Sequence, residues 1–380
     1  MRRYKGIYFD HAATSYPKPR AVQKAVERAL AEEGGNPGRS GHALSLRAAE
    51  RVFSARETLA EFFGLSDERG VVFTKNATEA LNLAVCVFTA KGGHVLCDDM
   101  AHNALLRPLC ALRDAGKITL SFFSARGSTE AIEGCFRTDT VLLCATHASN
   151  ICSHAIDARA IGRLCKRRGV SFVLDASQSA GHMRIDCERS GADAVCLPAH
   201  KGLFGIMGAG AVLFSHPEED YPVFLSGGSG AYSLSREMPR ELPEHFEAGT
   251  LPHPAIAAFE AGVKWVKEIG VDTIAAHIRQ LDEKLREGLG NTKDFRIHGE
   301  ETGSGIISFT HKTLAPARVA SLLDGKGFAV RAGLHCAPLA HAALGTLDLG
   351  GTVRVSLGYT NTEKECEHFF KAIQQIQGGA

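Results

Sequence analysis

The sequence predicts an α/β protein, with a large domain built on a mostly parallel sheet and a smaller α+β domain at the C-terminal end. Short apolar runs alternate with longer segments of helical period, and this alternation stops near Leu251. The length of 380 residues, with 44% hydrophobic and 22% charged residues, suits a globular chain of one large or two unequal domains.

The alternation before Leu251 has the order expected of βαβ units. A capped, amphipathic helix is expected at 76–84, and a crossover helix at 156–168. The strands expected around these helices cover residues 71–74, 95–97, 140–145, 170–174 and 192–197. Parallel sheets bind their ligands beyond the carboxyl ends of the strands, so residues at these ends are the first candidates for a functional site.

The C-terminal part has a different pattern. Two long helical segments, 255–269 and 271–289, are followed by strands expected at 303–310 and 353–357. Helices and strands that are grouped in this way suit a smaller α+β domain packed on the first one.

Charge and hydropathy exclude several classes of protein. The chain has 43 Lys and Arg against 42 Asp and Glu, a net charge of +1, so we expect no nucleic-acid partner. Its first ten residues lack the apolar core of a signal peptide. No apolar stretch approaches the about 20 residues that cross a bilayer, so we expect a soluble, cytoplasmic protein with no membrane partner.

The eleven cysteines divide into two kinds. Most of them stand in apolar runs, as Cys86, Cys144 and Cys196 do, where a free thiol behaves as a small hydrophobe in a reducing compartment. No Cys-x-x-Cys pair occurs, so neither a zinc ribbon nor a thioredoxin-type site is indicated.

Cys336 is different, because it stands in a polar loop that contains glycine and proline. Arg331, His335 and His341 are near it in the sequence, and each could lower the pKa of its thiol and so make a nucleophile. A structural loop cysteine is the first alternative. A metal site formed by His335, Cys336 and His341 is the second, which is disfavoured because one short loop supplies few ligands.

Two charged residues follow neighbouring strands at the expected sheet edge. Asp175 ends the strand 170–174, and Lys201 follows the strand 192–197 by a few residues. Enzymes that use pyridoxal phosphate need such a pair, a lysine that binds the cofactor and an acid that keeps its ring nitrogen protonated. A turn or capping aspartate and a solvated lysine are the ordinary alternatives.

An anion site is indicated at Asn76, Ala77 and Thr78, between a strand and a helix. Backbone N–H groups and the helix dipole hold anions at such a place, although N-capping is the commoner role of Asn and Thr there. The glycine-rich run 205–210 lacks the spacing of a dinucleotide-binding motif and is expected to form turns.

Together these segments resemble the cysteine desulfurases of the class V aminotransferase superfamily, which are fold type I pyridoxal phosphate enzymes. The resemblance extends in order over nearly the whole chain and includes the Arg-x-Gly-x-His-Cys loop found in one group of the family. The matching segments are 8–14, 76–79, His102, 149–150, 175–178, 200–201, 246–250, 331–336 and 354–357.

The resemblance implies a fold and an assembly. The fold has a mostly parallel seven-stranded sheet in a large domain over 16–250, with 1–15 and 251–380 forming the small domain. The assembly is a symmetric homodimer in which Thr250 reaches the cofactor phosphate of the other subunit.

The resemblance also implies the reaction, the conversion of L-cysteine to L-alanine with a persulfide left on Cys336. Lys201 would bind the cofactor and act as the base at Cα, His102 would stack on the ring, and Cys336 would attack the substrate sulfur. The residues that would hold pyridoxal phosphate are Ala77, Thr78, His102, Asn150, Asp175, Gln178, His200, Lys201 and Thr250.

Four residues are implied for the substrate. Arg354 would hold the carboxylate bidentately with help from Asn150, and Arg331 would lie nearby. His42 would line the entrance, although a polar residue that starts a helix is an equally good interpretation of it.

The chain departs from the family pattern near the lysine and the cysteine. Pro198 stands where a hydroxyl residue is usual and offers neither a hydroxyl nor an N–H group, so Thr78, His200 and Thr250 would do more of the phosphate binding. Ala199 replaces a glycine, and Leu334 replaces a histidine. These changes indicate a divergent subgroup.

Other functions stay open at this point. Selenocysteine lyase uses the same groups on L-selenocysteine, and an aminotransferase or β-lyase of the same fold would not need Cys336. A non-catalytic sulfur-relay scaffold is disfavoured by the presence of Lys201, Asp175 and Arg354. A sulfur-acceptor protein is a possible partner of the desulfurase.

Overall fold

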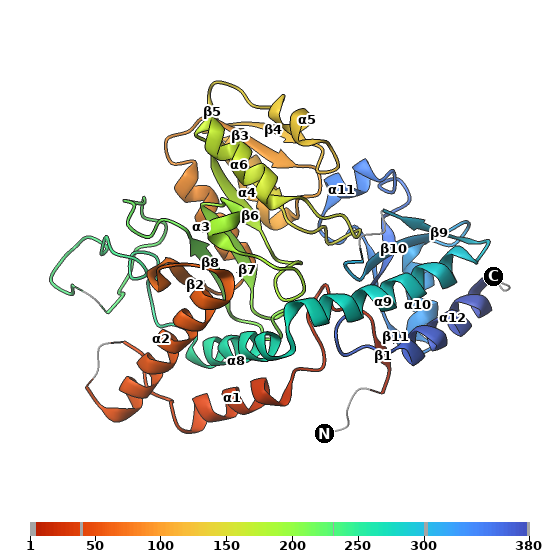
Figure 1. Ribbon diagram of the computed structural model, residues 1–380, viewed down its shortest axis with the longest axis horizontal. Helices are drawn as coiled ribbons and strands as arrows, with labels where there is room; N and C mark the ends of the chain where they lie inside the picture. Colours follow the sequence, from red (N-terminus) through yellow and green to blue (C-terminus); the bar gives the residue numbers. More distant parts are fainter. Residues whose placement is uncertain (1–4, 39–40, 231, 300–302, 378–380) are drawn as a thin grey trace.

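The computed structural model describes residues 5–38, 41–230, 232–299 and 303–377 (Figure 1). A large sheet and a smaller sheet organise these residues. The strands of the large sheet are β2 (Val71–Thr74), β3 (His94–Asp98), β4 (Thr119–Phe123), β5 (Thr140–Thr146), β6 (Ser171–Asp175), β7 (Ala194–Pro198) and β8 (Gly210–Phe214).

The large sheet has the strand order β2-β8-β7-β6-β5-β3-β4, seven strands among the described residues. Neighbours from β7 to β4 are parallel, whereas β8 is antiparallel to both β7 and β2. The connection from β7 to β8 has no crossover helix, so the chain turns back and β8 runs the other way. The prediction of a mostly parallel seven-stranded sheet is confirmed.

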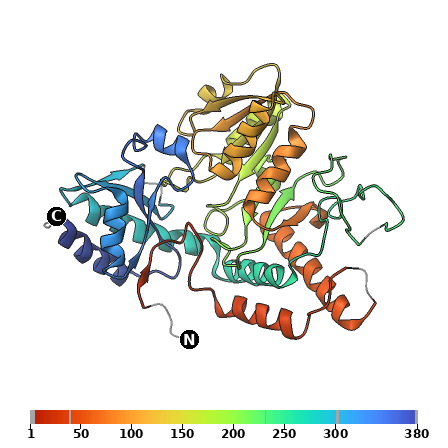
Figure 2. The same ribbon diagram turned by 180° about the vertical axis from the view of Figure 1, so that it is seen from behind.

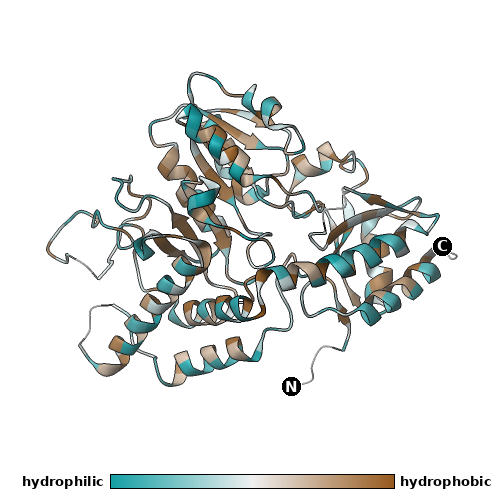
Figure 3. Ribbon diagram, in the orientation of Figure 1, coloured by the Kyte–Doolittle hydropathy of each residue, from teal (hydrophilic) through white to brown (hydrophobic). Residues whose placement is uncertain are grey.

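Side chains of the large sheet alternate between two apolar clusters. In β5, Leu143 and Ala145 pack in one cluster, and Leu142 and Cys144 pack in the other. The first face is covered by α2 (Ala43–Phe63), α6 (Ala158–Arg168) and α8 (His253–Ile269), the second by α3 (Ala77–Phe88) and α4 (Asn103–Asp114). In Figure 3 the strands of the large sheet are mostly hydrophobic, whereas the helices that surround the sheet also carry many hydrophilic residues.

The smaller sheet is antiparallel and has the order β12-β13-β10-β9. Its strands are β9 (Phe295–His298), β10 (Ile306–His311), β12 (Arg331–Gly333) and β13 (Thr352–Ser356). The helices of this part are α9 (Val271–Gly290), α10 (Pro316–Asp324), α11 (Pro338–Ala343) and α12 (Glu363–Gln377). Figure 2 shows this part beside the large sheet, which is the α+β arrangement expected from the sequence.

The N-terminal segment joins the C-terminal part. Strand β1 (Ile7–Tyr8) pairs in parallel with β11 (Phe328–Ala329), and Phe9 packs in the apolar cluster of the smaller sheet. The remaining helices are α1 (Arg20–Ala31), α5 (Thr129–Glu133) and α7 (Cys187–Ser190).

Helix α8 lies at the junction of the two parts. Its residues Ile256, Phe259 and Val263 pack in the cluster of the large sheet, whereas Val266 packs in the cluster of the smaller sheet. The domain limits at residues 16 and 250 stay a prediction, and α8 is the element on which they depend. None of the described helices is long and apolar enough to span a membrane.

Candidate active site

The candidate site lies beyond the carboxyl ends of β5, β6 and β7, where a parallel sheet binds its ligands. Asp175 is the last residue of β6, and Lys201 lies in the turn that follows β7. Both side chains line one pocket, as expected from their places at neighbouring strand ends.

The pocket gathers most of the residues singled out from the sequence. Eight of the nine residues expected to hold the cofactor line it, and Thr250 does not. The lining residues are Asn76, Ala77, Thr78, His102, Ala104, Thr146, Ala148, Asn150, Asp175, Ser177, Gln178, Pro198, His200 and Lys201.

Burial prepares the amine of Lys201 for reaction. Desolvation lowers the pKa of Lys201 to about 8; the carboxylate of Asp175 opposes this effect, and Arg354 adds to it. A lysine with this pKa is partly uncharged near neutral pH, and only the uncharged amine attacks a carbonyl carbon. Asp175 is itself buried and accepts a hydrogen bond from the Ser177 N–H at 2.9 Å, which fixes its carboxylate at the strand end.

His102 is held in place by the start of α4. Its Nδ1 accepts a hydrogen bond from the Ala104 N–H at 3.0 Å, so the proton of the neutral ring is on Nε2. Burial, the largest effect, lowers its pKa, with Asp175 acting against it. His102 is therefore a neutral, oriented ring on the wall of the pocket.

One end of the pocket is the N-terminus of α3. The Asn76 side chain caps this helix by accepting from the Glu79 N–H at 3.0 Å, so the capping interpretation is confirmed. Strand β8 approaches the same turn closely, because a Cβ at Gly210 would lie 2.7 Å from Asn76 C and 3.0 Å from Ala77 N. The helix end and its N–H groups form a place suited to a phosphate.

Three polar atoms in the pocket have no hydrogen-bond partner among the described residues. They are Thr146 Oγ1, Asn150 Oδ1 and His200 Nδ1, and all three are buried. Buried polar atoms are normally satisfied by a protein group, a ligand or a water. A lysine, an acid, a helix N-terminus and these free polar atoms are a set of groups that fits pyridoxal phosphate.

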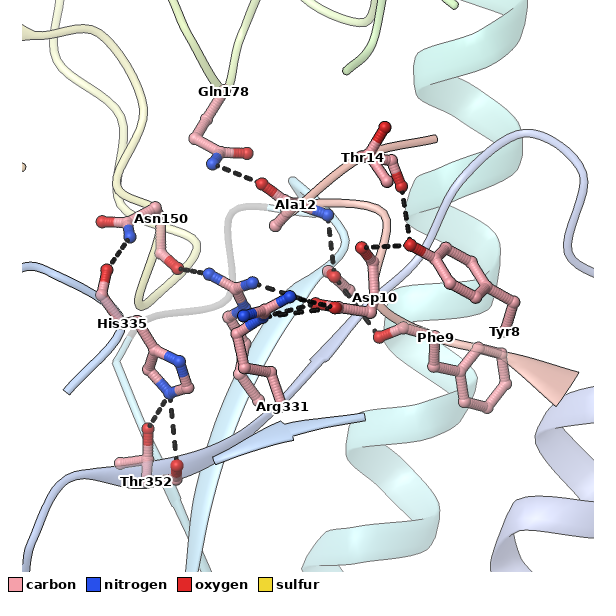
Figure 4. Close-up of polar contacts among 12 residues, drawn as sticks. Tyr8, Phe9, Asp10, Ala12, Thr14, Asn150, Gln178, Arg331, His335 and Thr352 are labelled. Carbon is pink, nitrogen blue, oxygen red and sulfur yellow. Dashed lines mark hydrogen bonds and ion pairs between the residues drawn. The ribbon is translucent and has the colours of Figure 1, made fainter. Parts of the chain in front are cut away.

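Two arginines share the carboxylate of Asp10 close to Asn150, a residue that lines the pocket (Figure 4). The pairing of β12 with β13 places Arg331 opposite Arg354, and both guanidinium groups bind Asp10. Arg331 Nη2 is 2.7 Å from Asp10 Oδ2, and Arg354 Nη2 is 3.1 Å from Asp10 Oδ1. Arg354 also donates to the backbone oxygen of Asn150 at 2.9 Å. Asp10 has one negative charge and the two arginines have two positive charges, so the group has a net positive charge. Such a charge suits the binding of a substrate carboxylate.

Cys336 is tethered at the rim of the pocket by its backbone. The Asn103 N–H, next to His102, donates to the Cys336 carbonyl at 2.7 Å, and Asn150 Nδ2 donates to the His335 carbonyl at 2.8 Å. His335 and Cys336 both have a positive φ, 47° and 58°, which side-chain-bearing residues rarely adopt. Of the eleven cysteines, Cys336 is the exposed one.

The positive charge expected around Cys336 comes from fewer residues than predicted. Burial lowers the pKa of His335 to about 3 and that of His341 to about 4, so both rings are neutral at pH 7. His341 is fully buried and bonds to Thr346 Oγ1 at 2.7 Å. Neutral rings cannot supply the positive charge that was expected of His335 and His341. Arg331, whose pKa Asp10 and, less strongly, Cys336 raise, is the charged one of these three residues.

His42 and Thr250, which were also expected at the site, do not line the pocket. His42 is the N-cap of α2 and accepts from the Ser45 N–H at 3.3 Å, so its interpretation as a helix-start residue is confirmed. Thr250 lines a separate groove, together with Phe53 and Glu247. Within the described ranges, no three or more His, Cys, Asp or Glu side chains are grouped to hold a metal ion.

Comparison with known proteins agrees with this geometry. The family model described as "Aminotransferase class-V" matches residues 7–369. A "Probable cysteine desulfurase" of Methanothermobacter thermautotrophicus is 32% identical over 98% of this chain and 95% of its own length. A Pyrococcus abyssi protein of the same description is 30% identical over 97% of this chain and 94% of its own.

The solved structures agree as well. The apo structure of a cysteine desulfurase from Thermococcus onnurineus NA1 has a TM-score of 0.91 and 28% identity, and the match covers 99% of this chain and 96% of that one. The chain therefore belongs to the cysteine desulfurase family of class-V aminotransferases.

Proposed function

We propose that the protein is a pyridoxal phosphate-dependent cysteine desulfurase, which converts L-cysteine to L-alanine and leaves a persulfide on Cys336. One observation supports this most strongly. Lys201 and Asp175 line one pocket, and the exposed Cys336 lies at the rim of this pocket. A hydrogen bond from the N–H of Asn103, the residue after His102, to the Cys336 carbonyl holds the cysteine there.

The groups that line the pocket divide the work. Bound pyridoxal phosphate would supply an electron sink for the charge that develops at the substrate Cα. Asp175 would keep the proton on the ring nitrogen, and the N-terminus of α3 would bind the phosphate. Arg354 and Asn150 would hold the substrate carboxylate, which orients the Cα–H bond toward the Lys201 amine as base.

The sulfur is then transferred to Cys336. The Cys336 thiolate attacks the substrate sulfur, so that an S–S bond forms and the Cβ–S bond breaks. The electron pair of the broken bond stays with the three-carbon fragment, which gains a proton at Cβ and leaves as alanine.

The test is product analysis with a matched pair of variants. Wild-type protein incubated with L-cysteine should form alanine, and mass spectrometry should find one extra sulfur on the peptide that contains Cys336. Cys336→Ser should lose at least about 100-fold in alanine formation, because no nucleophile remains to accept the sulfur. Cys86→Ser, at a partly buried position near the C-terminal end of α3, should behave as wild type.

The same experiment separates the alternatives. Full turnover of L-cysteine by Cys336→Ser would contradict the proposal and indicate a lyase or an aminotransferase. Parallel incubation with L-selenocysteine measures the preference between the two substrates.

Assembly and location are part of the proposal. We expect a symmetric homodimer in the cytoplasm that passes persulfide sulfur to a thiol-bearing acceptor protein. The groove that contains Thr250 supports the dimer, because in a single chain this residue lies away from the pocket it is expected to serve. The exposure of Cys336 supports transfer to an acceptor.

A further inference from the structure

A second pocket lies on the other side of Lys201, where the large sheet meets the smaller one. We call it the rear pocket, and define it by His11, Ser15, His182, Ser304 and Lys201. Lys201 and Gln178 line both the rear pocket and the candidate cofactor pocket. The lysine therefore separates two spaces, and the roles proposed above use only one of them.

The rear pocket collects buried polar atoms that lack partners. Nε2 of His182, Oγ of Ser304 and a ring nitrogen of His11 have no hydrogen-bond partner among the described residues, whereas the Tyr8 backbone interacts with the His11 ring. His11 is only 7% exposed, so solvent outside the protein does not satisfy its ring. Unpartnered polar atoms from three residues around one space indicate a polar ligand inside it.

Two glycines make the room for the histidine rings. A Cβ at Gly358 would lie 2.3 Å from His11 Nδ1, and a Cβ at Gly202 would lie 3.3 Å from His182 Nδ1 and 2.3 Å from the Ala180 carbonyl. Any larger residue at these positions would push on the rings or on the backbone. The sequence thus keeps the two imidazoles at the pocket wall.

The size of the rear pocket identifies the ligand. The volume open to the centres of water molecules is about 40 Å³. One water needs about 10–15 Å³ by this measure, so roughly three waters fit, whereas an amino acid does not. Ile274 and Ile278 of α9 form an apolar part of the wall, so the waters would gather at the histidine side.

We propose that the rear pocket holds a cluster of ordered waters that hydrogen-bond to His11, His182 and Ser304 and exchange protons with the Lys201 amine. The water part stands on the pocket alone, and the proton part rests on the proposed role of Lys201 as a base. After Lys201 has taken the Cα proton, one ammonium N–H bond breaks with its electron pair left on nitrogen. An O–H bond forms on a water, which releases another of its protons in turn.

The charge states of the histidines suit such a relay. Burial lowers the pKa of His11 and of His182 to about 4, so both rings are neutral at pH 7. A neutral imidazole has one donor and one acceptor nitrogen, so it can take a proton on one side and release one on the other. No atom is oxidised or reduced in these steps.

Ser15 connects the rear pocket to Lys18, so a proton could leave the pocket by this path. Its Oγ accepts a hydrogen bond from Lys18 Nζ at 2.8 Å. Burial lowers the pKa of Lys18 to about 7, close to that of Lys201, so Lys18 can hold or release a proton near neutral pH. Lys18 acts here through Ser15, which accepts its hydrogen bond, and not on the substrate.

The water part is tested by a high-resolution crystal structure of the wild-type protein. Density for ordered waters within hydrogen-bond distance of His11 and His182 is the expected result. A pocket without such density, or closed by side chains, would overturn the proposal. This measurement does not depend on turnover, so it stays informative if the protein does not act on cysteine.

The proton part is tested with L-cysteine deuterated at Cα, by measuring the deuterium retained in alanine. Wild-type protein should lose most of the label to solvent through the waters. His182→Leu removes a water ligand and should raise the retained fraction severalfold, and His182→Gln, which keeps a hydrogen-bonding group, should lie between them. Ser304→Val is a second variant that should raise retention, should His182→Leu not fold.

A buried histidine outside the rear pocket provides the control. His94, at the start of β3, is buried and also has an unpartnered Nε2 atom. His94→Gln should retain the wild-type fraction of deuterium. Equal retention in wild type, His182→Leu and Ser304→Val would overturn the proton route. Absence of any alanine from wild-type protein would instead contradict the proposed function.

Discussion

Asp10 is the residue on which the arginine pair depends. Its carboxylate binds both Arg331 and Arg354 (Figure 4). Arg354 is only 3% exposed. Asp10→Asn should lower the free energy of unfolding by about 3–5 kcal/mol, because it leaves a buried guanidinium without its counter-charge. Denaturant unfolding measures this effect.

Arg331→Ala is the matched control for Asp10. Its side chain is half exposed, and its loss leaves Asp10 and Arg354 as a balanced pair. We expect a cost of only about 0–1 kcal/mol in the same measurement. Equal costs for the two variants would contradict the view that the buried charge decides the outcome.

The reactivity of Lys201 has a pH dependence that follows from its surroundings. A lysine reacts as the free amine, so labelling of Lys201 in cofactor-free protein should rise with pH through about 8 and then level off, since burial lowers its pKa to that value. Asp175→Asn removes the charge that raises this pKa, so the rise should move to lower pH. Mass spectrometry of the labelled peptide distinguishes Lys201 from Lys18. A rise that continues toward pH 10.5, the unperturbed lysine value, would contradict the environment described.

At the residue scale, the sequence predicted identities better than charge states. Lys201, Asp175 and His102 could be found because each stands at a recognisable point of the chain, and the structure gathers them in one pocket. The neutrality of His335 could not be found, because it comes from burial by elements distant in the sequence. The contacts of Asp10 were missed for the same reason: its partner Arg354 is 344 residues away.

The contact between β8 and the start of α3 is the element-scale feature that shapes the phosphate end of the pocket. A Cβ at position 210 would lie 2.7 Å from the Asn76 backbone, so Gly210→Ala should move the helix start and cost about 1–3 kcal/mol of stability. The bound fraction of pyridoxal phosphate, measured by trapping the cofactor on the protein, should fall as well.

A glycine with free space gives the control for this change. At Gly325, after α10, an added Cβ would meet only an ordinary contact of 3.5 Å, with no positive φ. Gly325→Ala should leave both stability and bound cofactor near the wild-type values. A wild-type level of cofactor in Gly210→Ala would show that the close approach of β8 is not needed.

Two strands of the large sheet that the sequence analysis did not predict have weak patterns. Strand β4 has no fully apolar run, because four of its five residues are exposed or partly exposed. Strand β8 is apolar, but it follows directly on the glycine-rich run, which was expected to form turns. The buried strands β5 and β6 were found because a strand that is covered on both faces is an apolar run.

At the scale of the whole molecule, the sequence predicted two parts but not where they meet. The change of pattern near Leu251 marks the start of α8, yet most of the apolar face of this helix packs on the large sheet. A change in the sequence pattern of hydrophobic residues shows where one kind of secondary structure ends and another begins. It does not show which core a connecting helix joins, because that depends on packing.

The surface around the Thr250 groove provides the last prediction, which concerns assembly. Large apolar side chains are exposed near it: Phe53 of α2 is 51% exposed, and Leu234 is fully exposed at 102%. Exposed apolar side chains mark an interface when they form a contiguous patch, as we expect for these residues beside the groove. We expect sedimentation to find a dimer of the 40.6-kDa chain, with Phe53 buried between the subunits.

Two substitutions make this prediction specific. Phe53→Asp puts a charge into the expected interface, so it should shift the protein toward monomer and weaken the retention of pyridoxal phosphate, because Thr250 would lose the subunit that it serves. Leu30→Asp, at a 66% exposed position on α1 that does not line the groove, should leave both unchanged. An active wild-type monomer at working concentration would contradict the dimer. A Phe53→Asp monomer that retains its cofactor would contradict the role of Thr250 while leaving the interface in place.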